Sequence, residues 1–346
     1  MREKFKMFSL VSSVLAALFG AQAKAACPDA TLGETALDCP WSQVSRELTG
    51  VTDFDTIKDT LNHELPGFLG QIEQDSQSRG LLNLWGLSRN IDQSYFVQGL
   101  QTRTIPTNLL AYFKSVLNVQ YDSDFIYGHA GMNHTYGYLF SILQTPYGYK
   151  RARFVSGENE AGFGLPDGVF NGTPPAKGTL LSNFSYFIGS IAFRDNTLAT
   201  EDLNSLLYSG EIEVTDEIAN YDYSKLPVKR IVEIVENDSF YLEIRTDIVS
   251  YLFPNAKGTD TGMLIYSINY HEKTIEGIKR ARPRLITAFP VLLSSETGLF
   301  NPKGLGPTQP ITLNFNAALP VTIPADQMVG KRYIFDESTA PASSQR

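Results

Sequence analysis

Phe240-Tyr-Leu-Glu-Ile-Arg245 is the stretch that decides the fold class of this chain. Its residues alternate between apolar ones (Phe240, Leu242 and Ile244) and ones that carry a charge or a polar tip. Successive side chains of a strand lie on opposite faces, so this period of two predicts a half-buried β-strand. Such a strand needs partner strands elsewhere in the chain.

The second half of the chain holds further segments rich in β-branched and aromatic residues. Four of them are expected to be strands: Ser182 to Phe193, Met263 to Tyr270, Arg284 to Leu293 and Ile311 to Leu319. Val228 to Val235 fits either a helix or a strand, because its apolar residues recur at helical spacing but are mostly β-branched. Residues 199–219 are acidic and are expected to be helical.

The first half has the longer period of a helix. Apolar residues recur at helical spacing from Phe54 to Leu65, after a capping pair at Thr52-Asp53. A second helix is expected to begin at Pro106, and Leu81 to Trp85 is expected in the core. The sequence therefore predicts an α+β fold, with a helix-rich N-terminal half followed by a largely antiparallel, β-sheet-rich C-terminal half.

The first 25 residues have the pattern of a secretory signal peptide. A basic start (Arg2 to Lys6) precedes an apolar run from Met7 to Gly20, and cleavage sites of small residues end at Ala23 or Ala25. The apolar run is too short to cross a bilayer. We expect an exported protein, periplasmic or secreted, that loses residues 1–25 and has no membrane span.

The charge of the chain excludes one class of partner. Its 29 Lys and Arg residues stand against 37 Asp and Glu residues, a formal net charge of −8. Such a protein has no overall attraction for nucleic acid or anionic lipid, so bulk nucleic-acid binding is not expected.

The chain has 2 cysteines, Cys27 and Cys39. In an oxidising compartment we expect them to form a disulfide bond with each other. Closing so short a loop would stabilise the fold by about 3 kcal/mol and tie down the mature N-terminus.

Residues 156–178 are unusually rich in glycine and proline. Their large apolar side chains would suit a solvated linker poorly, so we expect a functional loop that covers a site. The loop separates a helix-rich region (26–155, with the disulfide loop) from a β-rich region (179–332), and the two form either one domain or two. The polar tail, 333–346, is expected to be flexible.

The strongest candidate for chemistry is Tyr127-Gly-His-Ala-Gly-Met-Asn-His-Thr-Tyr-Gly-Tyr138. Two of the 4 histidines, His129 and His134, lie here among glycines and tyrosines. Their imidazoles, with pKa values near neutral, would divide acid and base roles or bind a divalent metal; the alternative is a turn whose histidines make ordinary hydrogen bonds. Tyr136 and Tyr138 are expected to bind substrate through their flat faces.

Charged residues downstream complete the same predicted site. Lys150 and Arg151 would hold an anionic group of the substrate, and Glu158 or Glu160 would orient a histidine, act as a base or ligate a metal. This grouping rests on proximity in the sequence, and a charged strand edge is the alternative.

Other charged features stand apart from this site. The basic run from Lys279 to Arg284 fits an exposed connection or a phosphate contact. His271 fits either an ordinary turn or a remote member of the site, and His63 is expected to be exposed on the polar side of the first helix.

No specific catalytic or cofactor motif is present, neither a serine-nucleophile elbow nor a zinc-protease, phosphate-loop or dinucleotide-binding motif. We expect a hydrolase-like enzyme with a histidine-centred acid/base site at residues 129–138, acting on a small molecule or carbohydrate. The alternatives are a non-enzymatic protein that binds a carbohydrate or small apolar ligand, and a secreted effector or toxin. The sequence does not indicate an oligomeric state.

Overall fold

A computed structural model describes residues 44, 47–85, 95–97, 100–102, 108, 111–112, 157–170, 177–195, 197–236, 238, 240–253, 261–274, 277–280, 284–293 and 329–336. Its helices are α2 (Phe54–Glu64), α3 (Phe68–Gln77), α4 (Arg79–Trp85), α8 (Glu158–Phe163), α9 (Leu180–Ala192), α10 (Thr197–Tyr208) and α11 (Asp216–Ala219), with a 3-10 turn η1 (Tyr223–Lys225). Its strands are β1 (Tyr95–Val97), β2 (Leu100–Thr102), β3 (Val228–Glu236), β4 (Phe240–Ser250), β5 (Thr261–Thr274), β6 (Gly277–Arg280), β7 (Arg284–Leu292) and β8 (Val329–Asp336). The predicted α+β class, with helices first and an antiparallel sheet later, is confirmed.

The main sheet is antiparallel and has the order β6-β5-β4-β3-β8, with β7 also paired to β5. The long strand β5 pairs with β7 along its first part and with β6 along its second part. The predicted strands around Phe240, Met263 and Arg284 are confirmed as β4, β5 and β7, and the ambiguous segment at Val228 is the strand β3. The strand predicted at Ile311 to Leu319 lies outside the described residues.

The strand predicted at Ser182 to Phe193 is wrong, because this segment forms the helix α9. Its start is fixed by a capping box, in which Thr179 and Ser182 exchange side-chain and backbone hydrogen bonds. The helix is buried around nearly its whole circumference. The strand was expected from the aromatic and β-branched content of the segment, a weak signal that packing overrides, although its apolar residues also recur at helical spacing.

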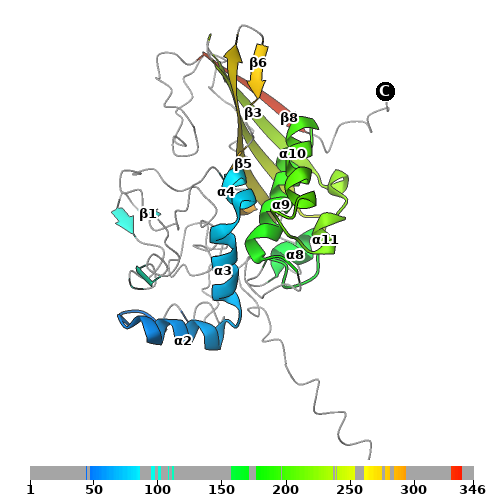
Figure 1. The fold of residues 1–346 in the computed structure, drawn as a ribbon. Coiled ribbons are helices and arrows are strands. Elements are labelled where there is room, and N and C mark those ends of the chain that lie inside the picture. Colours follow the sequence, from blue (N-terminus) through cyan, green and yellow to red (C-terminus); the bar gives the residue numbers. More distant parts are fainter. Residues whose placement is uncertain are drawn as a thin grey trace, which may run out of the picture.

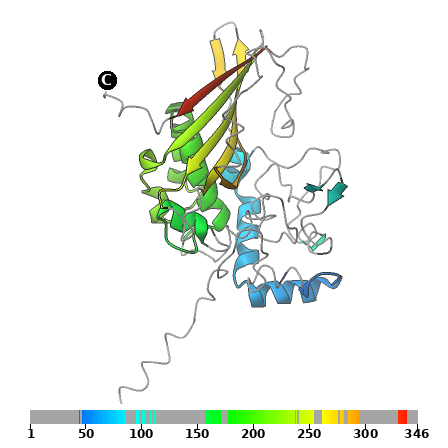
Figure 2. The ribbon, with the colours of Figure 1, turned by 180° about the vertical axis from the view of Figure 1, so that it is seen from behind.

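Helix α9 lies against the sheet in the middle of the helical layer, and α4 also contacts the sheet, through β7 (Figure 1). Helix α9 contacts β5 and β7 on one side and α3, α4, α10 and α11 on the others. The view from behind shows the opposite face of the strands in front of the helices (Figure 2). The described part of the chain thus forms a helical layer packed on one face of an antiparallel sheet.

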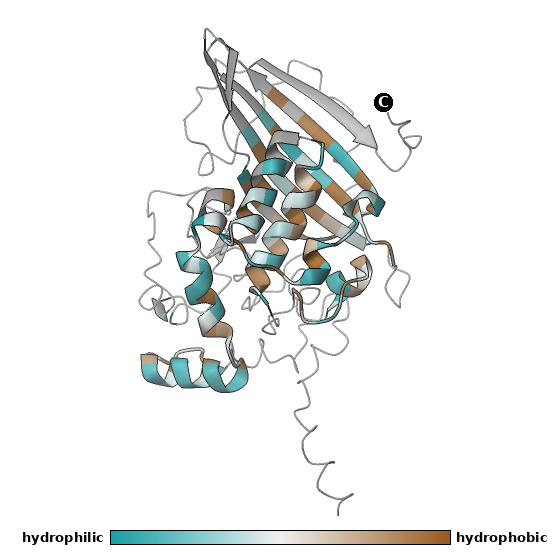
Figure 3. Cartoon of the chain, turned by 45° about the vertical axis from the view of Figure 1, so that its right-hand side comes forward, coloured by the Kyte–Doolittle hydropathy of each residue, from teal (hydrophilic) through white to brown (hydrophobic). Residues whose placement is uncertain are grey.

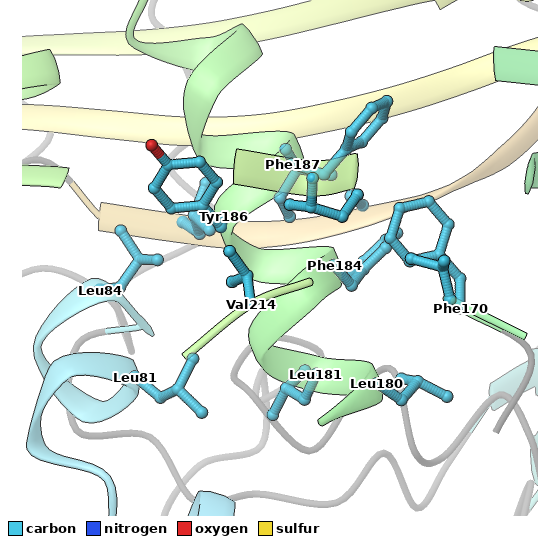
Figure 4. Close-up of a cluster of buried hydrophobic side chains, with 14 of the residues drawn as sticks. Leu81, Leu84, Phe170, Leu180, Leu181, Phe184, Tyr186, Phe187 and Val214 are labelled. Carbon is cyan, nitrogen blue, oxygen red and sulfur yellow. The ribbon is translucent and has the colours of Figure 1, made fainter. Parts of the chain in front are cut away.

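One hydrophobic core joins the N-terminal helices to the sheet. Leu81 and Leu84 of α4 lie on one side of α9 and Phe170 on the other (Figure 4). The indole Nε1 of Trp85 donates a hydrogen bond to Ser185 Oγ of α9 at 2.8 Å. Along the strands, hydrophobic and hydrophilic residues alternate in bands, whereas α2 is largely hydrophilic (Figure 3).

The described part of the glycine-rich segment 156–178 has structure of its own, contrary to the expectation of a long loop. It contains α8, and Phe163 and Phe170 are buried in the core. The ring centroids of Phe163 and Phe187 are 4.9 Å apart, and those of Phe170 and Phe187 are 5.3 Å apart. Opening this segment as a lid would expose both rings to water, which argues against a freely moving cover.

The first predicted helix is confirmed as α2, and Asp53 is its N-cap: its carboxylate accepts a hydrogen bond from Thr56 N. His63 is exposed, as predicted, with 81 % of its side chain accessible. The helix predicted from Pro106 lies mostly outside the described residues, and residues 108, 111 and 112 are helical. Within the described ranges, no helix combines the length and the apolar character needed to cross a membrane.

Candidate functional site

Most of the site predicted from the sequence lies outside the described residues. This holds for the signal segment 1–25, for residues 337–346 of the predicted tail (residues 333–336 belong to the strand β8) and for the following site residues: Cys27, Cys39, His129, His134, Tyr136, Tyr138, Lys150 and Arg151. Their predicted roles stay predictions. Glu158 and Glu160 are described, and both lie on α8.

The two glutamates have different surroundings. Glu160 is 1 % exposed, and its Oε1 accepts a hydrogen bond from Phe170 N at 2.7 Å. This bond joins the carboxylate to the backbone beyond α8, and the predicted roles of Glu160 in substrate binding or in orienting a histidine stay predictions. Glu158 is half-buried, in the first turn of α8.

A different group of charged residues lies on the face of the sheet that α9 covers. The strand register places the residues of β3, β4 and β5 in rows across this face. The first row, Val228–Val249–Met263, is apolar and belongs to the hydrophobic core. The next row is Arg230–Asp247–Ile265, and the two after it are Val232–Arg245–Ser267 and Ile234–Glu243–Asn269. We call these last two rows the polar rows.

The pair Arg230 and Asp247 is buried where the face changes from apolar to charged. Arg230 is 1 % exposed and Asp247 is 0 % exposed. Arg230 Nε donates to Asp247 Oδ1 at 2.6 Å, and Nη2 donates to Oδ2 at 3.1 Å. Nη2 also donates to the carbonyl oxygens of Ile191 and Ala192, at 3.1 and 3.3 Å. The arginine therefore binds the C-terminal end of α9, whose last carbonyls have no partner within the helix.

Arg245 extends this group toward the surface. Its Nη1 donates to Ala192 O at 3.0 Å and to Asp195 Oδ1 at 2.6 Å, and its Nη2 donates to Glu243 Oε2 at 3.0 Å. The same Asp195 oxygen lies 2.8 Å from Arg230 Nη1. Because the side chain of Asp195 is 46 % exposed, it joins the buried arginines to solvent. We call Arg230, Arg245, Asp195, Asp247 and Glu243 the ion cluster.

The ion cluster changes the acidity of its carboxylates in opposite directions. Burial raises the pKa of Asp247 above its usual range, and pairing with Arg230 opposes this change. Burial also acts to raise the pKa of Asp195, but Arg230 and Arg245 outweigh it and lower that pKa below its usual range. Asp195 is thus held as an anion at the exposed edge of the cluster.

Three buried polar atoms beside the ion cluster have no hydrogen-bond partner in the part of the chain that the structure describes. They are Arg245 Nε, Ser267 Oγ and Asn269 Oδ1. Asn269 uses its other polar atom, Nδ2, to donate to Glu243 Oε2 at 3.4 Å. All three residues lie in the polar rows, whereas other buried polar atoms without a partner among the described residues, such as Gln71 Nε2 and Thr215 Oγ1, lie elsewhere in the fold.

The sequence pattern did not reveal this cluster because β4 was expected to be half-buried. In the structure Ile244 and Ile248 are buried on one face of β4, and Arg245 and Asp247 are buried on the other. Arg230 and Asp247 lie in segments that carry other charged residues, such as Lys229 and Glu243, so the sequence did not single them out. Charged residues in such segments are rarely buried unless they are paired.

The charged side chains near the end of α9 are arginines and carboxylates, which form hydrogen bonds and ion pairs with one another. No group of three or more histidine, cysteine, aspartate or glutamate residues with the arrangement of a metal site occurs among the described residues. Comparison with known proteins finds no family model, no curated protein and no solved structure that matches this chain.

Proposed function

We propose that the protein is an exported binding protein for a small polar ligand. The ligand would lie at the polar rows, where β4 and β5 continue beyond the C-terminal end of α9. The observation that carries this proposal is the set of buried, unpartnered polar atoms on Ser267, Asn269 and Arg245.

Such atoms are costly in a folded protein. Leaving a buried polar group without a hydrogen bond costs about 1–3 kcal/mol, so buried polar groups normally have partners. A ligand with hydroxyl, carbonyl or amide groups would supply the missing partners. Its affinity would benefit from the fixed geometry, because Arg245 is already held by Ala192, Asp195 and Glu243.

The experiment compares two serines that are both fully buried. Ser267→Ala removes an unpartnered hydroxyl, whereas Ser185→Ala removes the acceptor of the Trp85 indole. Each variant is titrated calorimetrically with the ligands that the wild type binds from a panel of sugars, sugar acids, amino acids and dicarboxylates.

We expect Ser267→Ala to weaken ligand binding by about fivefold, the effect of one hydrogen bond, with little loss of folding stability. Ser185→Ala should leave the affinity unchanged and lower the free energy of unfolding by about 1–3 kcal/mol. Equal affinities of wild type and Ser267→Ala, or a wild type that binds nothing in the panel, would reject the proposal.

Turnover of the ligand by hydrolase-like chemistry is a second candidate function. It is supported by the sequence pattern at residues 129–138, and its predicted acidic residue Glu158 is half-buried in the first turn of α8. His129 and His134 would serve as acid and base, with or without a divalent metal. His134→Ala should abolish hydrolysis, and the exposed His63→Ala is the matched control that should not. Metal analysis of the wild type and of the His129/His134 double variant separates the metal-dependent form from the metal-free one.

Export belongs to the same proposal. The intact mass of the protein recovered from the periplasm or medium should equal that of a chain starting after Ala23 or Ala25. A full-length mass would contradict cleavage of the signal peptide.

A further inference from the structure

The unpartnered atoms of the polar rows are of different chemical kinds. Arg245 Nε can only donate a hydrogen bond, and Asn269 Oδ1 can only accept one, whereas Ser267 Oγ can do either. The register places Ser267 directly opposite Arg245, and Asn269 follows two positions later on the same face of β5. A ligand that meets all three atoms therefore needs an acceptor and a donor close together.

The pairing of β5 with its neighbours is interrupted at the same place. Its ladder with β7 has a bulge between Tyr266 and Ser267, where the register skips Ile286. This ladder ends at Ile268, and the ladder with β6 begins only after Asn269. Among the described strands, Asn269 is thus paired with β4 alone. Bulges are frequent beside functional sites, because they change the direction of a side chain and end the pairing of strands.

Two carboxylates already bind the guanidinium of Arg245. Asp195 Oδ1 lies 2.6 Å from its Nη1, and Glu243 Oε2 lies 3.0 Å from its Nη2. Glu243 Oε2 also accepts a hydrogen bond from Asn269 Nδ2 at 3.4 Å. A carboxylate therefore adjoins both Arg245 and Asn269. An anionic group of a ligand at Arg245 Nε would lie beside these like charges, which opposes its binding.

Simple ions do not match the unpartnered atoms. A carboxylate offers only acceptors, so it would leave Asn269 Oδ1 without a donor. An ammonium offers only donors, so it would leave Arg245 Nε without an acceptor. A trans amide offers both, but its N–H and C=O point in opposite directions. A hydroxyl group donates and accepts from one atom, and neighbouring hydroxyls of a sugar present both functions side by side.

We propose that the ligand of the polar rows is an uncharged sugar. This proposal rests on the proposed function, because it names the chemical class of the ligand that would bind there. One hydroxyl accepts a hydrogen bond from Arg245 Nε, a neighbouring hydroxyl donates to Asn269 Oδ1, and Ser267 Oγ bonds to either. Glu243 and Asp195 favour the uncharged sugar over the acid derived from it.

The test compares hexoses that share a ring and differ in charge. Glucose, galactose and mannose are titrated calorimetrically beside their uronic acids and their 2-amino sugars. The titrations are made at a mildly acidic pH, where the uronic acids are anions and the amino sugars are cations. We expect at least one neutral hexose to bind, and both of its charged derivatives to bind more weakly by about tenfold or more.

Two glutamates provide matched variants. Glu243→Gln removes the charge beside Arg245 and keeps an oxygen that accepts hydrogen bonds, whereas Glu217→Gln removes an exposed charge from α11. Helix α11 follows Thr215, whose backbone N–H donates to Asn183 in the first turn of α9, at the end away from the ion cluster. We expect Glu243→Gln to reduce the preference for the neutral sugar over its uronic acid by about threefold or more, and Glu217→Gln to leave it unchanged. Far-ultraviolet circular dichroism confirms that both variants are folded.

Any of three results would overturn the assignment of an uncharged sugar. They are no binding of a neutral hexose, a charged derivative bound as tightly as its neutral parent, and equal preferences in Glu243→Gln and Glu217→Gln. The first two need only the wild type, so they decide even if a variant does not fold.

Failure of the proposed function is distinguishable from these results. If a charged ligand binds best and Ser267→Ala weakens its binding, the polar rows bind a ligand and only its chemical class is wrong. If Ser267→Ala weakens the binding of no ligand, the polar rows are not the site.

Discussion

Removing Arg230 and Asp247 together should cost the protein less stability than the sum of the two single removals. Arg230→Met would leave the fully buried Asp247 without its two hydrogen bonds and would remove one donor from Ile191 O and one from Ala192 O, which keeps its bond from Arg245. Breaking a buried ion pair from one side costs about 3–5 kcal/mol, and we expect this variant near the upper end.

Asp247→Leu should cost less, about 3 kcal/mol, because Arg230 keeps Asp195 Oδ1 at 2.8 Å. The double variant Arg230→Met/Asp247→Leu leaves neither charge in the core, so its cost should fall below the sum of the two single costs by at least about 2 kcal/mol. The loss that remains is the missing donor for the end of α9.

The assay is equilibrium unfolding in urea, with the coupling energy taken from the double-mutant cycle. Lys229→Met, at the neighbouring exposed position of β3, is the control and should change stability by less than about 1 kcal/mol. Additive costs, or single variants that lose less than about 1 kcal/mol, would refute the reasoning. If the single variants do not fold, a double variant with more folded protein than either would still demonstrate the coupling.

Three smaller predictions follow from single sites. The pKa of Asp195 is lowered from 3.8, so the stability that this carboxylate contributes is present above pH 3.8 and is lost as the pH falls below it. In Asp195→Asn, the free energy of unfolding should therefore decrease less steeply toward acid pH than in the wild type. Burial raises the pKa of Tyr221 to about 12, so the folded protein should lose stability as the pH rises above 10, and the phenolate absorbance that appears near pH 12 should be missing in Tyr221→Phe. Thermal unfolding should give opposite changes in stability for two glycine-to-alanine substitutions. Gly70→Ala, with open space around the new Cβ, should stabilise α3 by about 0.5–1 kcal/mol. Gly162→Ala would overlap the Tyr251 ring and should cost about 1–3 kcal/mol.

The fold was predictable where one face of an element repeats with a clear period. Alternation at Phe240 to Arg245 identified β4, and helical spacing after Asp53 identified α2. The prediction failed at Leu180 to Ala192, where aromatic and β-branched residues favoured a strand although the apolar residues also recur at helical spacing. Such content is a weak signal, and the capping box and the packing of the segment decide for a helix.

The ion cluster was not predictable for a different reason. Arg230 and Asp247 are 17 residues apart, and Arg245 lies 50 residues from Asp195. Charged residues that alternate with apolar ones are normally assigned to solvent, and only the packing of α9 on the sheet buries these. Their partners are set by strand register and by the position of a helix end, neither of which the sequence states directly.

The contacts of α9 show which hydrogen bonds of the ion cluster the fold itself requires. The last carbonyls of the helix need donors, and the Nη atoms of Arg230 and Arg245 supply them; the carboxylates of Asp247 and Asp195 then balance the buried charges. These bonds would be needed in a protein with no ligand at all. The fold makes no such use of Arg245 Nε, Ser267 Oγ or Asn269 Oδ1 within the described residues. Alanine could replace Ser267 with little loss of stability, so a serine at that position is better explained by something that binds there than by the fold.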